Sequence, residues 1–208
     1  MNLKNHYWYF TSVLSPKFCD EIIENGKRNQ EEFARTGGFK EKNLSKDQIK
    51  EIKKKRNSNI VWMNDQWIYK EILPYVHAAN RNAGWNFNWD YSESCQFTKY
   101  NPGQYYGWHC DSWNEPYADK DNPDTFGKIR KLSVTCSLSD PSEYKGGELE
   151  FNFNDPEKTK KQNIRKCVEI LPKGSICVFP SFVWHRVCPV KKGTRHSLVI
   201  WNLGESFK

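Results

Sequence analysis

The chain has 208 residues, a hydrophobic content of 37% and a formal net charge of +7, from 32 basic and 25 acidic residues. This length is typical of one sizeable domain, and the composition does not indicate disorder overall. The basic excess is concentrated in KKKR at 53–56 and KTKKQNIRK at 158–166. Such runs either form a solvated face or attract an anionic partner, nucleic acid included.

The sequence shows no feature of export or membrane insertion. The first residues, MNLKNHYWYF, lack the long apolar stretch of a secretory signal, and no run of about 20 apolar residues could span a membrane. The seven Cys are scattered, without a CxxC pair. We therefore expect reduced thiols and a cytoplasmic protein with no membrane partner.

The first helix is predicted from its N-terminal signals. A short strand is expected within residues 8–14, and Ser15-Pro16 is typical of an N-cap followed by the first helical position. The helix should end near Gly26. Its buried stripe is expected to contain Phe18, Ile22 and Ile23.

Two more helices and a strand are predicted before residue 85. The polar segment 30–58 contains a basic helix at about 45–55, and SNIVWM at 58–63 is typical of a strand. A second amphipathic helix is expected at about 64–84. The residues that it should bury are Trp67, Ile68, Ile72 and either Tyr75 or Val76.

From residue 85 the hydrophobic pattern changes to short, strand-like runs. They lie at about 85–91, 94–100, 104–108, 130–138, 148–153, 166–171, 175–179, 182–188 and 195–202. Turn sequences such as NPG, LPKG and KKGT separate most of them. This pattern predicts a mainly β, antiparallel sandwich or barrel with the N-terminal helices packed on one face. The polar segment 112–129 predicts a long loop.

His109 and Asp111, in YYGWHCDSW, form the first part of a candidate metal site. Residues i and i+2 of an extended chain point to the same side, so both could reach one ion. The pair is equally compatible with a local hydrogen-bonded turn. His185, in FPSFVWHRV, is the candidate third ligand or a packed core histidine. Two His and one carboxylate on one face would suit non-haem Fe(II) that binds a cosubstrate and O2.

Arg195 adds a further element to this candidate site. If the segment after His185 forms a hairpin centred near Lys191, Arg195 is a diagonal neighbour of His185, about 7–8 Å away. A small dicarboxylate could then chelate the metal at one end and meet the guanidinium at the other. In this register His196 points to the opposite face, and a slip of one residue would reverse that expectation.

Three stretches resemble the catalytic core of the 2-oxoglutarate and Fe(II)-dependent oxygenases, specifically the prolyl 4-hydroxylase-like branch. They are QFTKYNPGQYYGWHCD, RKLSVTCSLSDPSEYKGGELEF and LPKGSICVFPSFVWHRVCPVKKGTRHSLVIW, between about 94 and 202. VLSPKFCDEII and SNIVWMND are also similar to the family's leading helix and support region. The resemblance implies one catalytic domain over 1–208. It would consist of a helical support region at 1–84 and a double-stranded β-helix, a jelly-roll core, at 85–208.

The resemblance also implies roles for single residues. His109, Asp111 and His185 would be the iron ligands. Arg195 would pair with the C5 carboxylate of 2-oxoglutarate, and the hydroxyl of Tyr100, nine residues before His109, would assist it. Tyr100 is also compatible with an ordinary aromatic residue of the core.

Other matched positions have less specific roles. Ser133 or Thr135 would offer a further hydroxyl to the cosubstrate, and Trp201 would pack near its pocket. Gly146-Gly147-Glu148 matches a structural turn in which glycine permits the backbone bend.

The implied activity is hydroxylation of a C–H bond, most simply on a peptidyl proline, with release of succinate and CO2. Fe(II), 2-oxoglutarate and O2 are the implied cofactor and cosubstrates, and ascorbate is a further candidate. Aromatic side chains near the metal could grip a proline-containing peptide or stack on a nucleobase. Those considered are Tyr105, Tyr106, Trp108, Trp113 and Tyr117. The loop at 112–129 is expected to close over the substrate.

Several alternatives stay open at this point. The same chemistry could act on a nucleic acid or on a small free amino acid. The fold could also serve as a binding module without turnover. A nucleic-acid-binding protein recruited by its basic runs would show affinity that falls steeply with salt and survives His109→Ala.

Overall fold

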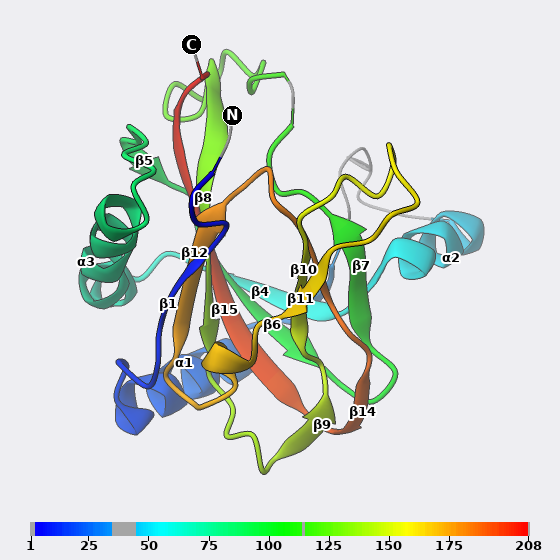
Figure 1. Cartoon of the computed structure of the whole chain (residues 1–208). Helices are drawn as coiled ribbons and strands as arrows, with labels where there is room; N and C mark the ends of the chain where they lie inside the picture. The colour runs from blue at the N-terminus through cyan, green and yellow to red at the C-terminus, as the bar shows by residue number, and fades with distance from the viewer. Residues whose placement is uncertain (1–2, 35–44, 114, 208) are drawn as a thin grey trace.

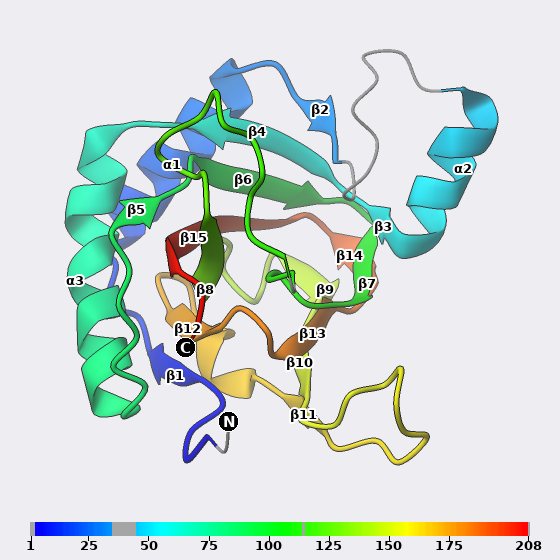
Figure 2. The ribbon, with the colours of Figure 1, turned by 90° about the horizontal axis from the view of Figure 1, so that it is seen from above.

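Two antiparallel β-sheets face each other in the computed structural model, which describes residues 3–34, 45–113 and 115–207 (Figures 1 and 2). Side chains from both sheets line one cavity between them, as in a jelly roll. The predicted fold class, mainly β with an antiparallel core and supporting helices, is confirmed. Positions 35–44, part of the polar segment expected after the first helix, lie outside the described residues.

The larger sheet takes strands from the whole length of the chain. In spatial order it contains β1 (Trp8–Phe10), β12 (Ile176–Pro180), β8 (Lys128–Ser137), β15 (Arg195–Glu205), β6 (Cys95–Tyr100), β4 (Asn59–Met63) and β2 (Glu32–Phe33). A short strand, β5 (Tyr91–Ser92), also pairs with β15. Because β1, β2 and β4 belong to this sheet, the N-terminal region contributes strands as well as helical support.

The smaller sheet carries the other wall of the cavity. Its order is β11 (Ile164–Lys166), β10 (Leu149–Asn152), β13 (Trp184–Val187), β7 (Tyr105–His109) and β3 (Arg56–Asn57). A separate pair, β9 (Tyr144–Gly146) and β14 (Val190–Gly193), lies at the end of the barrel (Figure 1).

Alternation along β8 gives the larger sheet two different faces. Leu132, Val134 and Cys136 point outward into the main hydrophobic cluster, whereas Ser133 and Thr135 point inward between the sheets. Successive side chains of a strand point to opposite faces, so the serine and threonine positions make a polar lining without disturbing the core. The apolar outer face is covered by helices.

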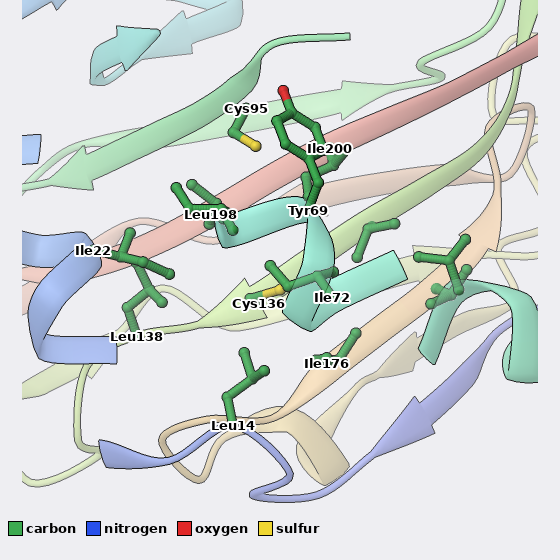
Figure 3. Packing of buried hydrophobic residues seen from close by; sticks show 14 of the residues in the cluster. Leu14, Ile22, Tyr69, Ile72, Cys95, Cys136, Leu138, Ile176, Leu198 and Ile200 are labelled. Atoms are coloured by element: carbon green, nitrogen blue, oxygen red, sulfur yellow. The ribbon is translucent and has the colours of Figure 1, made fainter. Parts of the chain in front are cut away.

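The helices that cover this face are α1 (Pro16–Arg28) and α3 (Gln66–Asn82), as Figures 1 and 2 show. Figure 3 shows their side chains packed with those of the sheet, the labelled ones being Leu14, Ile22, Tyr69, Ile72, Cys95, Cys136, Leu138, Ile176, Leu198 and Ile200. Fully burying one such aliphatic side chain stabilises the fold by roughly 1.5–3 kcal/mol.

The predicted helix signals are confirmed. Ser15 Oγ accepts a hydrogen bond from the Phe18 N–H at 3.1 Å, and Pro16 follows it. The basic helix α2 (Lys46–Lys55) begins at a capping box formed by Ser45 and Gln48. It lies away from α1 and α3, beside the smaller sheet (Figure 2).

The predicted buried stripes are confirmed except at one position. Ile22 and Ile23 are buried in α1, and Phe18 is partly buried against Trp67. In α3, Ile68, Ile72 and Val76 are buried. Trp67 is 37% exposed, so the prediction that it lies in the core is wrong.

Two predicted strands are largely wrong. Residues 85–91 form no regular strand before Tyr91, because Asn86 has a φ of 52° and the Asn80 side chain satisfies the backbone of Phe87. The predicted strand 166–171 ends at Lys166, and a 3-10 helix (Val168–Ile170) follows it. The short strands β2, β3, β9 and β14 were not predicted from the sequence.

Two further expectations concerned free thiols and the absence of membrane-spanning helices. The seven Cys are all free, as expected. Within residues 3–34, 45–113 and 115–207, the helices are too short or too polar to cross a bilayer.

Gly26 offers a test of the packing of α1 on the sheet. A Cβ atom there would lie 2.6 Å from Phe97 Cδ1. We expect Gly26→Ala to lower the free energy of unfolding by about 1–2 kcal/mol, because overpacking of roughly 1–3 kcal/mol exceeds the roughly 1 kcal/mol gain in helix propensity. Urea unfolding would measure this. Glu21→Ala, on the exposed face of the same helix, should change stability by less than about 0.5 kcal/mol; a stabilised Gly26→Ala protein would contradict the packing.

Candidate functional site

His109, Asp111 and His185 form a cluster of metal-ligating groups between the two sheets. Each offers one ligand atom, and these atoms all lie within 4.8 Å of one another. His109 ends β7 and is the direct cross-strand partner of His185 on β13. Asp111 follows β7 by two residues. The structure therefore brings together the three residues that the sequence singled out.

A β-bulge beside this cluster sets which side chains of β7 face the cavity. Between the pairs His185–His109 and Val187–Tyr106, β7 has one residue more than β13. The extra residue places Tyr106 on the same face as His109, and their rings stack with centroids 3.5 Å apart. Trp108 points to the other face, where Arg186 Cζ lies 4.5 Å from its ring centroid.

Backbone carbonyl groups orient both imidazoles. Nδ1 of His109 lies 2.8 Å from the Gly107 oxygen, and Nδ1 of His185 lies 3.0 Å from the Val183 oxygen. Because a carbonyl only accepts, each Nδ1 carries a proton, and this tautomer of a neutral ring leaves the Nε2 lone pair for a metal. The two Nε2 atoms lie 3.6 and 3.5 Å from the carboxylate oxygens of Asp111.

The Asp111 carboxylate is held from the larger sheet. Ser133 Oγ donates to its Oδ2 at 2.7 Å and lies 2.9 Å from Ser181 Oγ. The Asp111 N–H donates to the Ser181 carbonyl oxygen at 2.8 Å. Oδ1 faces the His109 ring, and Oδ2 also lies near Nε2 of His185. Two imidazole nitrogens and one carboxylate oxygen on one side of a cavity fit a divalent metal such as Fe(II).

Electrostatics keep this cluster in the form that binds metal. Burial alone would raise the pKa of the Asp111 carboxyl, but the nearby His185 and His109 hold it well below its usual range. Burial lowers the pKa of His185 to about 4, and His109 acts in the same direction. At neutral pH the carboxylate is therefore ionised and His185 is neutral.

A cavity beside the cluster is lined by both sheets. Strands β6, β8, β12 and β15 of the larger sheet and β7, β10 and β13 of the smaller sheet contribute to it. Its lining residues include Gln96, Tyr100, Tyr106, Thr135, Ser197 and Trp201. Tyr100 is 3% exposed, and its hydroxyl makes no hydrogen bond to the described residues.

Arg195 lies near this cavity because of a strand pairing that differs from the predicted one. The expected hairpin does not form, because β14 occupies the supposed turn and pairs with β9. His185 and Arg195 lie in different sheets, so the predicted diagonal neighbourhood is wrong. Arg195 is instead the cross-strand partner of Tyr100, with Cζ 5.5 Å from the tyrosine ring centroid. It is 3% exposed and donates to Ser197 Oγ at 3.2 Å.

The remaining predicted positions separate into lining and supporting residues. Thr135 and Trp201 line the cavity. Ser133 instead binds Asp111. His196 points to the outer face, as expected, and stacks on Phe97 with centroids 5.5 Å apart. Gly146 and Gly147 have φ values of 80° and 68°, and a Cβ at Gly147 would lie 2.9 Å from Arg195 Cδ.

Two of the aromatic residues expected beside the metal face elsewhere. Trp108 is on the outer face of the smaller sheet, and the Tyr105 hydroxyl donates to the Lys53 carbonyl oxygen at the end of α2. Tyr117 donates to Glu93 Oε1 at 2.7 Å, and Trp113 is 51% exposed. The described part of the predicted loop has no helix or strand before β8 begins at Lys128.

Arg130, which the sequence did not single out, also lies beside the site. Its guanidinium is 3.9 Å from the Trp201 ring centroid and 5.2 Å from that of Trp113, and it pairs with Glu93 at 2.6 Å. A bulge at Lys131, opposite Asn202 and Leu203, turns Arg130 to the cavity side. No sequence signal marks that extra residue. Arg56 was likewise read only as part of a charge run.

Comparison with known proteins gives the family. Residues 95–202 match the family model of the 2OG-Fe(II) oxygenase superfamily, which is more than half of the chain. The chain belongs to this superfamily. The matched range contains the cluster of His109, Asp111 and His185 and the cavity-side residue Arg195.

Curated relatives are PKHD-type hydroxylases. The chain is 36% identical over 105 residues to one from Picosynechococcus sp., covering 50% of this chain and 39% of that protein. It is 34% identical over 105 residues to one from Klebsiella pneumoniae, covering 50% and 41%. The match thus spans about two fifths of the length of these relatives.

Solved oxygenase structures share the fold of the whole chain. A viral collagen prolyl hydroxylase from Paramecium Bursaria Chlorella virus-1 has a TM-score of 0.62 and 20% identity, covering 97% of both chains. A Pseudomonas putida prolyl-4-hydroxylase has a TM-score of 0.63 and 18% identity, covering 96% of this chain and 92% of that one. A Trichoplax adhaerens prolyl hydroxylase, solved with a hypoxia inducible factor peptide, has a TM-score of 0.61 and 18% identity, covering 96% and 84%.

His196 gives a pH-dependent test of the sheet that carries Arg195. Burial lowers the pKa of His196 from 6.5 to about 4, so the unfolded chain binds more protons between these pH values. Stability should therefore fall as the pH drops from about 6.5 to about 4. We expect His196→Gln to remove about 1–2 kcal/mol of this loss, after allowing for partial solvent screening. Urea unfolding of the metal-free protein at pH 7 and pH 5 measures it; an unchanged difference would contradict the expectation.

Proposed function

We propose that the chain is a catalytic domain, over residues 1–208, that hydroxylates a C–H bond with Fe(II), 2-oxoglutarate and O2. The observation that carries this proposal is the cluster of two imidazole nitrogens and one carboxylate oxygen within 4.8 Å, at the wall of a cavity. Such a set holds one side of a metal and leaves the other side for a cosubstrate and O2.

In this proposal His109, Asp111 and His185 hold the iron. The Gly107 and Val183 carbonyl oxygens fix the two imidazoles, and Ser133 fixes the carboxylate, so the ligands are oriented before the metal binds. When bound, the iron and 2-oxoglutarate supply the oxidising chemistry, which yields succinate and CO2 and hydroxylates the substrate. The apolar residues around the cluster, Phe179 and Leu149 among them, exclude water from it.

Arg195 is proposed to bind the distal carboxylate of 2-oxoglutarate. It is buried and forms no ion pair with a described carboxylate. The Tyr100 hydroxyl, free toward the described residues, and the Thr135 hydroxyl would donate hydrogen bonds to the same ligand. Trp201 would pack against it.

The proposed substrate is a peptidyl proline in a protein. Exposed tryptophans stand on the cavity side: Trp62 is 47% exposed and lies 6.2 Å from Trp201, and Trp113 is 51% exposed. Such indole rings suit a proline ring held in an extended peptide. The structural neighbours named as prolyl hydroxylases support this choice, and the curated relatives are named hydroxylases. Nucleic acid and a free amino acid remain the competing substrates to be tested.

A cytoplasmic location and the use of ascorbate as a reductant are also part of the proposal. The seven free thiols support a reducing compartment.

The metal site is tested by anaerobic addition of Fe(II) and 2-oxoglutarate. We expect the weak visible charge-transfer band of the chelate in the native protein. Asp111→Ala should abolish it, because one of three protein ligands is lost. Asp140→Ala, at an exposed turn, is the matched control and should keep the band. A band that persists in Asp111→Ala would overturn the ligand assignment.

Substrate class is tested by succinate release. Peptides that contain proline should stimulate it above the substrate-free rate, and the same peptides with alanine in place of proline should not. Stimulation by single-stranded RNA or DNA, or by free amino acids alone, would replace the peptide proposal with the corresponding alternative.

Ser133 is predicted to be a positioning residue for the metal. Ser133→Ala removes the hydrogen bond to Asp111 Oδ2 and should weaken Fe(II) binding about 10–100-fold, the usual cost of losing such support. Ser137→Ala is the control, because Ser137 Oγ donates to the Ile170 carbonyl oxygen instead. Anaerobic metal titration compares the two; equal affinities would refute the role.

A further inference from the structure

Arg56 is a buried cation without a counter-charge. It is 4% exposed, its Nε donates to Ser58 Oγ at 3.0 Å, and its Nη2 is buried with no hydrogen-bond partner among the described residues. No described carboxylate lies within ion-pair distance of it. One face of the guanidinium lies over the Tyr106 ring, with Cζ 4.5 Å from the centroid.

Two other arginines of this region do have carboxylate partners. Arg130 pairs with Glu93 at 2.6 Å, and Arg186 pairs with Glu150 at 2.7 Å. Burial of an unpaired guanidinium is strongly unfavourable, and a contact with an aromatic ring offsets only part of that cost. A buried arginine with a purely structural role is expected to form an ion pair with a carboxylate of the same protein. Arg56 has no such partner among the described residues, so it is suited to bind the anionic group of a ligand.

The strand register places Arg56 beside the cavity. Arg56 on β3 is the cross-strand partner of Tyr106 on β7, and Tyr106 lines the cavity. Burial raises the pKa of Tyr100, and the charges of Arg56 and then Arg195 oppose that increase, so both guanidinium groups lie near this phenol. Arg195 is the partner of Tyr100 on the next strand. Tyr100 therefore has a buried arginine on each side.

We infer that Arg56 and Arg195 together bind the distal carboxylate of 2-oxoglutarate, from the two sides of Tyr100. This inference rests on the proposed function. Charge-assisted hydrogen bonds from two planar guanidinium groups would satisfy both oxygens of that carboxylate and neutralise the end of the cavity away from the metal. The unpartnered Nη2 of Arg56 gains its acceptor only when the cosubstrate is bound.

The test compares two ligands that differ only at the distal end. 2-Oxoglutarate and 2-oxovalerate share the 2-oxo acid group, but 2-oxovalerate lacks the distal carboxylate. Their dissociation constants are measured by calorimetry on the Fe(II) protein under anaerobic conditions. Arg56→Met should weaken 2-oxoglutarate binding about 10–100-fold, the range for lost hydrogen bonds to a charged group, and change 2-oxovalerate binding less than about threefold.

The stability of the ligand-free protein gives a second, independent readout. Arg56→Met replaces an unpaired buried charge with an apolar chain, so the melting temperature should rise by a few degrees. Arg186→Met is the matched control, since Arg186 also lies 4.5 Å from an aromatic ring centroid but has a carboxylate partner. It should lower the melting temperature and leave 2-oxoglutarate binding unchanged.

Each outcome decides between the carboxylate role and a structural role. Equal weakening of both ligands, unchanged 2-oxoglutarate binding, or a melting temperature lowered as in Arg186→Met would overturn the inference. Should Arg56→Met fail to fold, Arg56→Lys is the alternative, because it keeps the charge but loses the planar guanidinium group that donates two hydrogen bonds. It should weaken 2-oxoglutarate binding by a smaller factor and leave 2-oxovalerate binding unchanged. A native protein that binds Fe(II) but neither ligand would overturn the proposed function itself.

Discussion

The direct pairing of His109 with His185 across two antiparallel strands is the constraint on which the site depends. It brings two imidazoles from positions 76 residues apart along the chain to the same wall of the cavity. Their Nδ1 atoms are both fixed by carbonyl oxygens two residues away, at 2.8 and 3.0 Å. Because neighbouring backbone carbonyl groups orient both rings, the pair of strands β7 and β13 sets the positions of the two imidazoles. The larger sheet contributes the hydrogen bond from Ser133 that orients the Asp111 carboxylate.

One face of the larger sheet forms the main hydrophobic core, and the other face lines the cavity of the candidate site. Outward side chains of β8 and β15 pack under α1 and α3, and inward side chains of the same sheet, such as Thr135, Ser197 and Gln96, present hydroxyl and amide groups to the cavity. This separation lets polar groups be buried at the site without weakening the main core. Substitutions such as Ser133→Ala can therefore be used to examine metal binding while the helix-covered face remains intact.

The charged side chains of the site differ in whether they have a partner of opposite charge. Asp111 lies near two imidazoles and near Arg130, whose own partner is Glu93. Arg56 and Arg195 have no such compensation among the described carboxylates, and both lie near Tyr100. The two arginines thus need a carboxylate from a ligand to balance their charge, which is the physical basis of the proposed dicarboxylate cosubstrate.

The sequence by itself determined the helix starts, the change of period near residue 85 and the His109–Asp111 pair, because caps, alternation and an HxD pair depend on local spacing. His185 was a candidate third ligand, and the family resemblance implied its role. Only the tertiary structure decided how strands pair. It separated His185 and Arg195 into different sheets, and it inserted bulges that turned Tyr106 and Arg130 toward the cavity. A bulge or a pairing register depends on contacts between distant strands, and therefore leaves no signal in the local pattern of residues.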